Sequence, residues 1–200
     1  MANDTLDIML DLETMGNGNK PVLAQLAAVC FKLEQGIPLD SFNKLISPQS
    51  CVKVGLTCAS TYGSDPTMDW WLKQDKDVFN KIIVEALLHG EELDQVLTQF
   101  SQWLKEMMKK HGCKYVRVYG KGPAADCVWL RSAYDSCDMK APWMFWDDCC
   151  VRTYLDISFR AFGVKIKDMP FEGSKHDAID DCKHQIKMVS AVFKLMKKSN

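Results

Sequence analysis

The sequence has almost no net charge and no long uninterrupted apolar run. Among its 200 residues, 25 lysines and arginines offset 26 aspartates and glutamates, which leaves a formal charge of −1 at pH 7. No global positive field therefore attracts the chain to polyanions, so any contact with nucleic acid must be local. The apolar run from Val22 to Phe31 contains Gln25 and is too short to cross a bilayer. We therefore expect no membrane insertion.

Signals for secretion and for disulfide bonding are also lacking. The segment from Met1 to Asp4 has no basic stretch followed by an apolar one, so we expect no secretory signal. The nine cysteines are odd in number, irregularly spaced and contain no Cys-x-x-Cys pair. Disulfide frameworks of small secreted proteins use even numbers of patterned cysteines. The sequence therefore predicts reduced thiols and a cytoplasmic protein.

The length and the hydrophobic content of the chain favour one compact domain over residues 1–200. Hydrophobic residues make up 47% of the chain, which is enough for one buried core, whereas 200 residues are few for two domains. No internal repeat, low-complexity segment or linker divides the chain. We therefore treat the chain as a single folding unit.

Apolar patterns predict strands first and alternating strands and helices afterwards. Strands are expected at 6–13, 22–33, 37–47, 115–119 and 143–146. Helices are expected to start near 64–66 and to span 91–111, 124–136, 150–162 and 177–197. The second strand is apolar on both faces, which is typical of a central strand. This order indicates an α/β fold with a mixed sheet: an antiparallel meander plus parallel strands, flanked by helices.

Three acidic residues are candidates for a cation site. Asp11 and Glu13 lie two apart on a strand, so their side chains leave the same face. At ~7 Å and an effective dielectric of about 20 they would repel by roughly 2 kcal/mol, which a cation between them would offset. Asp126 follows the glycine loop 120–123, at a helix start. Carboxylates are the ligands of Mg²⁺ or Mn²⁺, but a solvated strand end and a helix-start acid are the simpler alternatives.

A fourth candidate segment precedes the last helix. Gly173 and Ser174 predict that His176 lies on a loop, with Asp177 near the N-cap. Asp180 would then satisfy the first helical turn, which leaves Asp181 available for another role. A surface imidazole near a helix start is the simpler alternative for His176.

Taken together, these segments resemble the DEDDh exonucleases. The motifs are Asp11-Leu12-Glu13-Thr14-Met15-Gly16, Asp126, Trp70-Trp71 with Gln74, Arg152-Thr153 and His176-Asp177-Ala178-Ile179-Asp180-Asp181-Cys182. They are most similar to the branch of T-even phage exonuclease A and exodeoxyribonuclease VIII. The resemblance covers nearly the whole chain and implies an RNase H-like fold. If the protein is phage-encoded, its compartment is the host cytoplasm.

The resemblance implies a mechanism. Asp11, Glu13, Asp126 and Asp181 would hold two divalent ions, Mg²⁺ or Mn²⁺, that bind the scissile phosphate and activate a water, and His176 would accept the proton of that water. The reaction would release nucleoside 5′-monophosphates from single-stranded 3′ ends, with DNA favoured by the phage-type resemblance. The alternatives are a 3′-5′ exoribonuclease on the same site and a non-catalytic protein that binds nucleic-acid ends. A homodimer is compatible with the sequence.

The resemblance also suggests substrate contacts, each with a structural alternative. Thr14 and Met15 would touch the terminal nucleotide, and Leu12 would act as a wedge or belong to the core. Trp70 and Trp71 cannot both face inward, so the exposed one would stack on a base, or both would be partly buried packing residues. Arg152 would pair with a phosphate or join a surface network with Asp147 and Asp148.

Some positions depart from the family pattern or are ambiguous. Ala125 stands where many relatives have an aromatic residue, and Lys121 stands where they have Asn. Lys121 would contact a phosphate or remain a solvated charge. Lysines also cluster at 105–111 and at 187–198. The first cluster is foremost a solvated helix face and secondarily a nucleic-acid track, and the second suits a helix carboxyl end.

Overall fold

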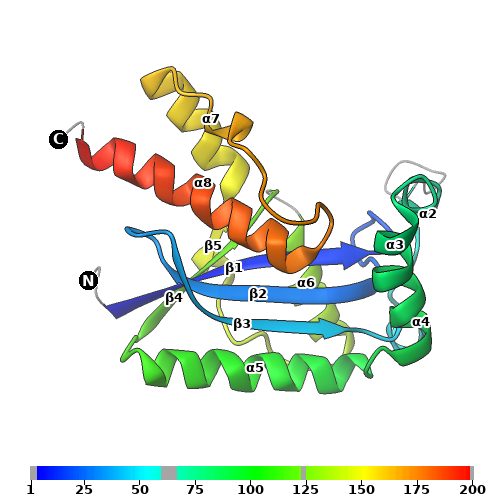
Figure 1. Cartoon of the computed structure of the whole chain (residues 1–200). Helices are drawn as coiled ribbons and strands as arrows, with labels where there is room; N and C mark the ends of the chain where they lie inside the picture. The colour runs from blue at the N-terminus through cyan, green and yellow to red at the C-terminus, as the bar shows by residue number, and fades with distance from the viewer. Residues whose placement is uncertain (1–3, 60–66, 123–124, 199–200) are drawn as a thin grey trace.

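The computed structural model describes residues 4–59, 67–122 and 125–198. Its sheet consists of β1 (Thr5–Thr14), β2 (Leu23–Lys32), β3 (Ile37–Leu45), β4 (Tyr115–Gly120) and β5 (Asp148–Cys150). The strand order is β3-β2-β1-β4-β5 (Figure 1). Pairing is antiparallel between β1 and β2 and between β2 and β3, and parallel from β1 to β4 and from β4 to β5. The predicted mixed sheet with an antiparallel meander is confirmed.

Helices cover both faces of the sheet. The α-helices are α1 (Pro48–Lys53), α2 (Thr67–Trp71), α3 (Lys76–Phe79), α4 (Glu85–His89), α5 (Leu93–Lys110), α6 (Asp126–Ser136), α7 (Val151–Phe162) and α8 (Ala178–Lys198). A π-helical turn spans Asn80–Val84, and 3₁₀ turns span Phe145–Asp147 and Ile166–Asp168. The long helix α5 lies on one side of the sheet, and α7 and α8 lie on the other (Figure 1). Within the described ranges, no helix combines the length and apolarity that a bilayer span requires.

The alternation of β1 decides which face carries the acids. Leu6, Ile8, Leu10 and Leu12 belong to the core cluster that packs against α5 and α6. Met9 belongs to the cluster that packs against α8. Because side chains alternate along a strand, Asp11 and Glu13 share the Met9 face. The acids therefore leave the sheet toward α8, at the carboxyl end of β1.

One predicted strand is wrong. Residues 143–146 do not pair with the sheet; the parallel pairing of β5 with β4 begins at Asp148, opposite Val118. Trp143 instead packs between Phe100 and Tyr134 on the α5 face, with ring centroids 6.3 and 6.2 Å away. Its indole N–H donates to Asp148 Oδ1 at 2.9 Å. Trp143 is thus the buried member of the run, whereas Met144, Phe145 and Trp146 are exposed. Periodicity cannot distinguish so short an apolar run from a strand.

Other expectations have mixed outcomes. No disulfide bond joins cysteines in the described ranges. The predicted helix start at 64–66 lies outside the described residues, and α2 follows it at Thr67. Sequence patterns missed α1, α3 and α4, which are four to six residues long. Helices this short leave too few residues to show a periodicity.

Asp7, on the α8 face of β1, yields a prediction on stability. Burial raises the pKa of Asp7 to about 6, although the Tyr119 hydroxyl donates to its Oδ1 at 3.3 Å. The folded state therefore keeps a proton that the unfolded chain loses, so stability falls as the pH rises from about 4 to about 6. We expect Asp7→Asn to raise the unfolding free energy at pH 7 by up to about 3 kcal/mol and to change little at pH 4.

The measurement is urea unfolding of both proteins from pH 4 to pH 8. Subtracting the two curves removes the contribution of every other carboxylate. A difference that does not grow between pH 4 and pH 6 would contradict the assignment.

Candidate active site

The carboxyl end of β1 brings Asp11 and Glu13 under the first turns of α8. The Asp11 Oδ1 atom accepts a hydrogen bond from Gln185 Nε2 of α8 at 2.8 Å. Gln185 is fully buried, so this amide is a fixed donor rather than a surface side chain. Glu13 is also buried. The helix therefore orients the Asp11 carboxylate and restricts its access to water.

Asp126, the first residue of α6, is held against the end of β1. Its carboxylate accepts the backbone N–H of Leu12 at 3.3 Å and that of Lys121 at 2.9 Å. The close approach requires a glycine beneath it, because a Cβ on Gly120 would lie 3.0 Å from Asp126 Oδ2. The loop after β4 and the backbone of β1 thus fix this third acid beside the first two.

His176 and Asp181 form a tight corner before α8. The backbone N–H of His176 donates to Asp181 Oδ2 at 2.9 Å, and His176 adopts a left-handed backbone with φ of 64°. One potential ligand atom from each of Glu13, His176 and Asp181 lies within 4.8 Å of the others. His176 is on the loop, as predicted. One oxygen of Asp181 is engaged by the loop backbone, so this acid also organises the corner.

The predicted role of Asp177 at the start of α8 is confirmed, and the predicted role of Asp180 is wrong. Asp177 Oδ1 accepts the N–H groups of Ile179 and Asp180, so Asp177 caps the first turn of α8. Asp180 does not do so; its Oδ2 accepts the N–H of Ser174 at 3.1 Å, and its Oδ1 pairs with Lys183 at 3.0 Å. The Ser174 contact lowers the pKa of Asp180. The loop that contains Ser174 therefore contacts the first turn of α8, and a helix-capping rule alone does not predict this contact.

Asp180→Ala therefore tests a structural role. We expect a loss of about 1 kcal/mol in unfolding free energy, because one charge-assisted backbone hydrogen bond is removed, and a turnover within about threefold of wild type. Urea unfolding and steady-state kinetics measure the two effects. A collapse in rate as large as that of Asp181→Ala would assign Asp180 to the catalytic set instead.

The four acids repel one another. Burial, together with the charges of Asp126, Glu13 and Asp181, raises the pKa of Asp11 well above its ordinary value. Burial and the neighbouring acids do the same for Glu13, and burial raises the pKa of Asp126 to about 6. In the part of the chain that the structure describes, no lysine or arginine forms an ion pair with any of these four acids. An oxygen-rich cluster without an ion-paired cation fits divalent cations such as Mg²⁺ or Mn²⁺.

The two adjacent tryptophans have different environments. Trp71 is 1% exposed and belongs to the core, and its indole N–H donates to the Thr14 carbonyl at 2.9 Å. Trp70 is 40% exposed, and its ring meets the His176 ring edge-on, with centroids 4.9 Å apart. Trp71 therefore supports the end of β1, and Trp70 is the member of the pair that borders the imidazole.

The remaining predicted contacts divide between core and surface. Leu12 and Met15 are buried in the main core cluster, as the core alternative for Leu12 anticipated. The Thr14 hydroxyl donates to the Gly16 carbonyl at 2.7 Å. Arg152 is exposed at the start of α7. The alternative network for Arg152 is wrong, because Asp147 and Asp148 pair with other arginines, Arg117 and Arg131.

Two supporting residues were missed from the sequence. Gln185 lies four residues after Asp181, on the same helix face, so its spacing was a usable signal. Lys81, in the π-helical turn, pairs with Asp177 next to His176. The two residues are 96 positions apart, and no local pattern connects them.

Comparison with known proteins identifies the family. The sequence profile described as the 3′-5′ exoribonuclease Rv2179c-like domain matches residues 6–193. The chain belongs to the Rv2179c-like family. A search of curated proteins gives no significant match. The family description names a 3′-5′ exoribonuclease domain, which makes the chain a hydrolytic exonuclease by family, and the fold is that of solved DEDDh exonucleases, while the phage-type branch stays a prediction.

Solved structures share the fold of this Rv2179c-like chain. Cell-death related nuclease 4 (CRN-4) is similar with a TM-score of 0.65 and 18% identity over 95% of this chain. The nuclease domain of 3′hExo, a DEDDh family member bound to rAMP, is similar with a TM-score of 0.59 and 18% identity. The match covers 96% of this chain and 92% of the 3′hExo domain. E. coli exonuclease I in complex with a dT13 oligonucleotide is similar with a TM-score of 0.57 and 13% identity over 97% of this chain. The chain spans 64% of CRN-4 and 43% of exonuclease I.

Proposed function

We propose that this chain hydrolyses the terminal phosphodiester at the 3′ end of single-stranded nucleic acid and releases nucleoside 5′-monophosphates. The observation that carries the proposal is the convergence of Glu13 from β1, His176 from the loop and Asp181 from α8, with Asp11 and Asp126 coupled to them electrostatically. A cluster of buried and half-buried acids beside an imidazole, on a DEDDh-type fold, is what cation-assisted phosphodiester hydrolysis requires.

Asp11, Glu13, Asp126 and Asp181 would hold two divalent ions. When bound, such ions neutralise phosphate charge and favour deprotonation of the attacking water. The chain contributes the orientation of the ligands. Gln185 fixes Asp11, and two backbone N–H groups hold Asp126. Ligands that are already oriented lose little freedom on binding a cation.

His176 would accept the proton of the attacking water at a ring nitrogen. Its ring borders Trp70, and the adjacent Asp177 is tied to Lys81. These contacts come from α2 and from the π-helical turn, so two separate attachments restrain the corner that carries the imidazole. A general base must stand within hydrogen-bond reach of its proton, and this restraint serves that requirement.

The sugar preference has two candidates. The phage-type resemblance favours DNA, whereas the description of the matched family names an exoribonuclease, which favours RNA. Exonuclease I is described with a dT13 oligonucleotide and a 3′-exonuclease relative with a histone mRNA stem-loop, so the same fold accommodates both polymers. RNA is therefore the second candidate substrate. The cytoplasmic location and the oligomeric state stay predictions.

The deciding experiment uses single-stranded DNA and RNA of identical sequence, each labelled at the 5′ end, with Mg²⁺ or Mn²⁺ and with or without EDTA. We expect stepwise shortening from the 3′ end, mononucleotide products and complete inhibition by EDTA. Faster shortening of one polymer assigns the sugar preference. Internal cleavage, or a rate that EDTA does not change, would contradict the proposal. Asp11→Asn protein prepared in parallel excludes a contaminating nuclease.

A further inference from the structure

A pocket of about 340 Å³ lies between α7 and the segment 164–167, and it reaches Lys121. Four cations line it: Lys121, Arg152, Lys165 and Lys167. The apolar part of the lining includes Leu155, Phe159 and Val164. The mechanism proposed above uses none of the apolar residues and neither Lys165 nor Lys167.

The charge of this pocket is uncompensated. Asp156 also lines it, but its carboxylate pairs with Arg160 at 2.9 Å. Throughout residues 4–59, 67–122 and 125–198, none of the four lining cations forms an ion pair with a carboxylate. In a chain with a net charge of −1, four unpaired cations around one pocket create a local attraction for a polyanion.

The apolar part of the pocket is open to a ligand. The Phe159 side chain is 47% exposed and Val164 is 40% exposed. Exposed aromatic rings beside cations are the usual means of binding single-stranded nucleic acid, because bases stack on rings while phosphates meet the cations. A divalent cation or an acidic metabolite would need no such ring.

The pocket is continuous with the candidate active site. Lys121 contributes to the pocket wall, and its backbone N–H donates to Asp126 at 2.9 Å. Arg152, at the start of α7, contributes to the same wall. A strand whose phosphate lies at the acids therefore meets Lys121 and Arg152 first and the rest of the pocket next.

The sheet order shows which part of the strand the pocket faces. Met15, whose backbone the resemblance places beside the terminal nucleotide although its side chain is buried, is on the β2 side of β1, where its N–H donates to the Val22 carbonyl at 2.9 Å. Lys121 follows β4, and Arg152 follows β5, on the opposite side of β1. The terminal nucleotide and the pocket would thus lie on opposite sides of the scissile phosphate.

We propose that this pocket binds the nucleotides on the 5′ side of the scissile bond, with Lys165 and Lys167 contacting phosphates and Phe159 stacking on a base. The inference rests on the proposed function, because it assumes that a strand is bound at the acids. It assigns to α7 and the segment after it the task of holding the polymer while its end is cleaved.

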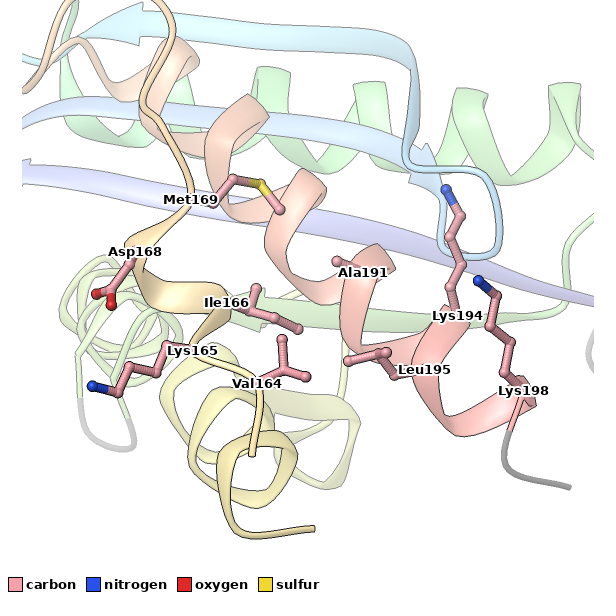
Figure 2. A pocket seen from close by; sticks show the side chains of 9 residues that line it. All are labelled: Val164, Lys165, Ile166, Asp168, Met169, Ala191, Lys194, Leu195 and Lys198. Carbon is pink, nitrogen blue, oxygen red and sulfur yellow. The ribbon is translucent and has the colours of Figure 1, made fainter. Parts of the chain in front are cut away.

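A second groove on the other side of this segment is a poor alternative path. It measures about 480 Å³ and lies between the segment 164–169 and the last turns of α8. Figure 2 shows Val164, Ile166 and Leu195 turned toward one another there, while Lys165 extends away from α8. Lys194 on its rim already donates to the Gln35 carbonyl. None of its lining residues borders Asp126, so it is not continuous with the acids.

The test compares two substrates and two double variants. One substrate is a single-stranded 10-mer, and the other is the p-nitrophenyl ester of thymidine 5′-monophosphate, which has one scissile bond and no upstream strand. The pocket variant is Lys165→Ala with Lys167→Ala. The control is Lys105→Ala with Lys109→Ala, which removes the same charge from α5 on the opposite face of the sheet.

For the pocket variant we expect the KM of the 10-mer to rise about tenfold, while kcat/KM for the ester stays within twofold of wild type. The plot of log kcat/KM against log salt for the 10-mer should become less steep by about 1.4, because each phosphate contact on a single strand contributes about 0.7. The control should match wild type. Phe159→Ala should raise the KM of the 10-mer about tenfold. Phe145→Ala, which removes an exposed ring just before the first residue of β5, should leave this KM unchanged.

Several outcomes would overturn the inference. An unchanged KM and salt slope in the pocket variant would do so, as would an equal change in the α5 control. A matching loss on the ester would show that the lysines act on the catalytic centre rather than on the strand. If wild type cleaves neither substrate, the proposed function fails instead, so the two failures are distinguishable.

Discussion

Asp11→Asn should abolish nuclease activity and stabilise the cation-free protein at the same time. Burial and three neighbouring acids raise the pKa of Asp11, so its charge is unfavourable in the folded state without a cation. Asparagine removes that charge, and its amide oxygen can still accept the hydrogen bond from Gln185. We expect a gain of at least about 1 kcal/mol at pH 8, which corresponds to about 2–4 °C in Tm.

The activity of the same variant should fall more than about 1,000-fold, because a metal ligand is lost. Asp181→Ala should lose activity to a similar degree. Thermal unfolding in EDTA and the 3′-end assay with Mg²⁺ measure the two effects, with the exposed Asp135→Asn as a charge-matched control that changes neither. Full activity in Asp11→Asn would exclude this site, and a lower Tm would contradict the repulsion among the acids.

The sign of the pH dependence follows from the same reasoning. An acid whose pKa is raised by folding contributes stability at low pH that is lost as the pH rises toward its folded pKa. Wild type in EDTA should therefore lose stability as the pH rises above about 4, and Asp11→Asn should lose less. Saturating Mg²⁺ should reverse the difference at pH 8, because the cation stabilises wild type more than a variant that lacks one ligand.

Replacing His176 should lower kcat by about 100- to 1,000-fold while leaving the KM for an oligonucleotide and the affinity for Mn²⁺ nearly unchanged, because only proton transfer is removed. His176 meets Asp181 through its backbone N–H, so a new side chain does not remove that hydrogen bond. Single-turnover rates and Mn²⁺ titration measure the effects.

The choice of substitution matters because His176 has a φ of 64°. Alanine is strained in this region, whereas asparagine tolerates it, so His176→Asn separates the loss of the ring from a distortion of the loop. Both variants should be equally slow. An active His176→Asn would show that the loop conformation, rather than the imidazole, is what the reaction needs.

Trp70 illustrates where sequence reasoning reached its limit. The adjacent tryptophans indicated that the two rings cannot both face inward, since neighbouring residues on a helix face different directions, and left open that both are partly buried. Which ring is buried depends on the packing of α2 against the end of β1, where Trp71 donates to Thr14. Nor could the contact between Trp70 and His176 be foreseen, because it joins segments more than 100 residues apart.

The sequence by itself determined the meander and the long helices, because alternation and capping are local properties of the chain, whereas the five polar side chains proposed for catalysis followed from the resemblance to the DEDDh exonucleases. Only the tertiary structure decided that Gln185 meets Asp11 across 174 positions, that Asp180 secures a loop rather than a helical turn, and that β5 begins at Asp148. It also decided that Arg152 borders a basic pocket beside Asp126. Such contacts depend on how elements pack in three dimensions, and no local pattern encodes that packing.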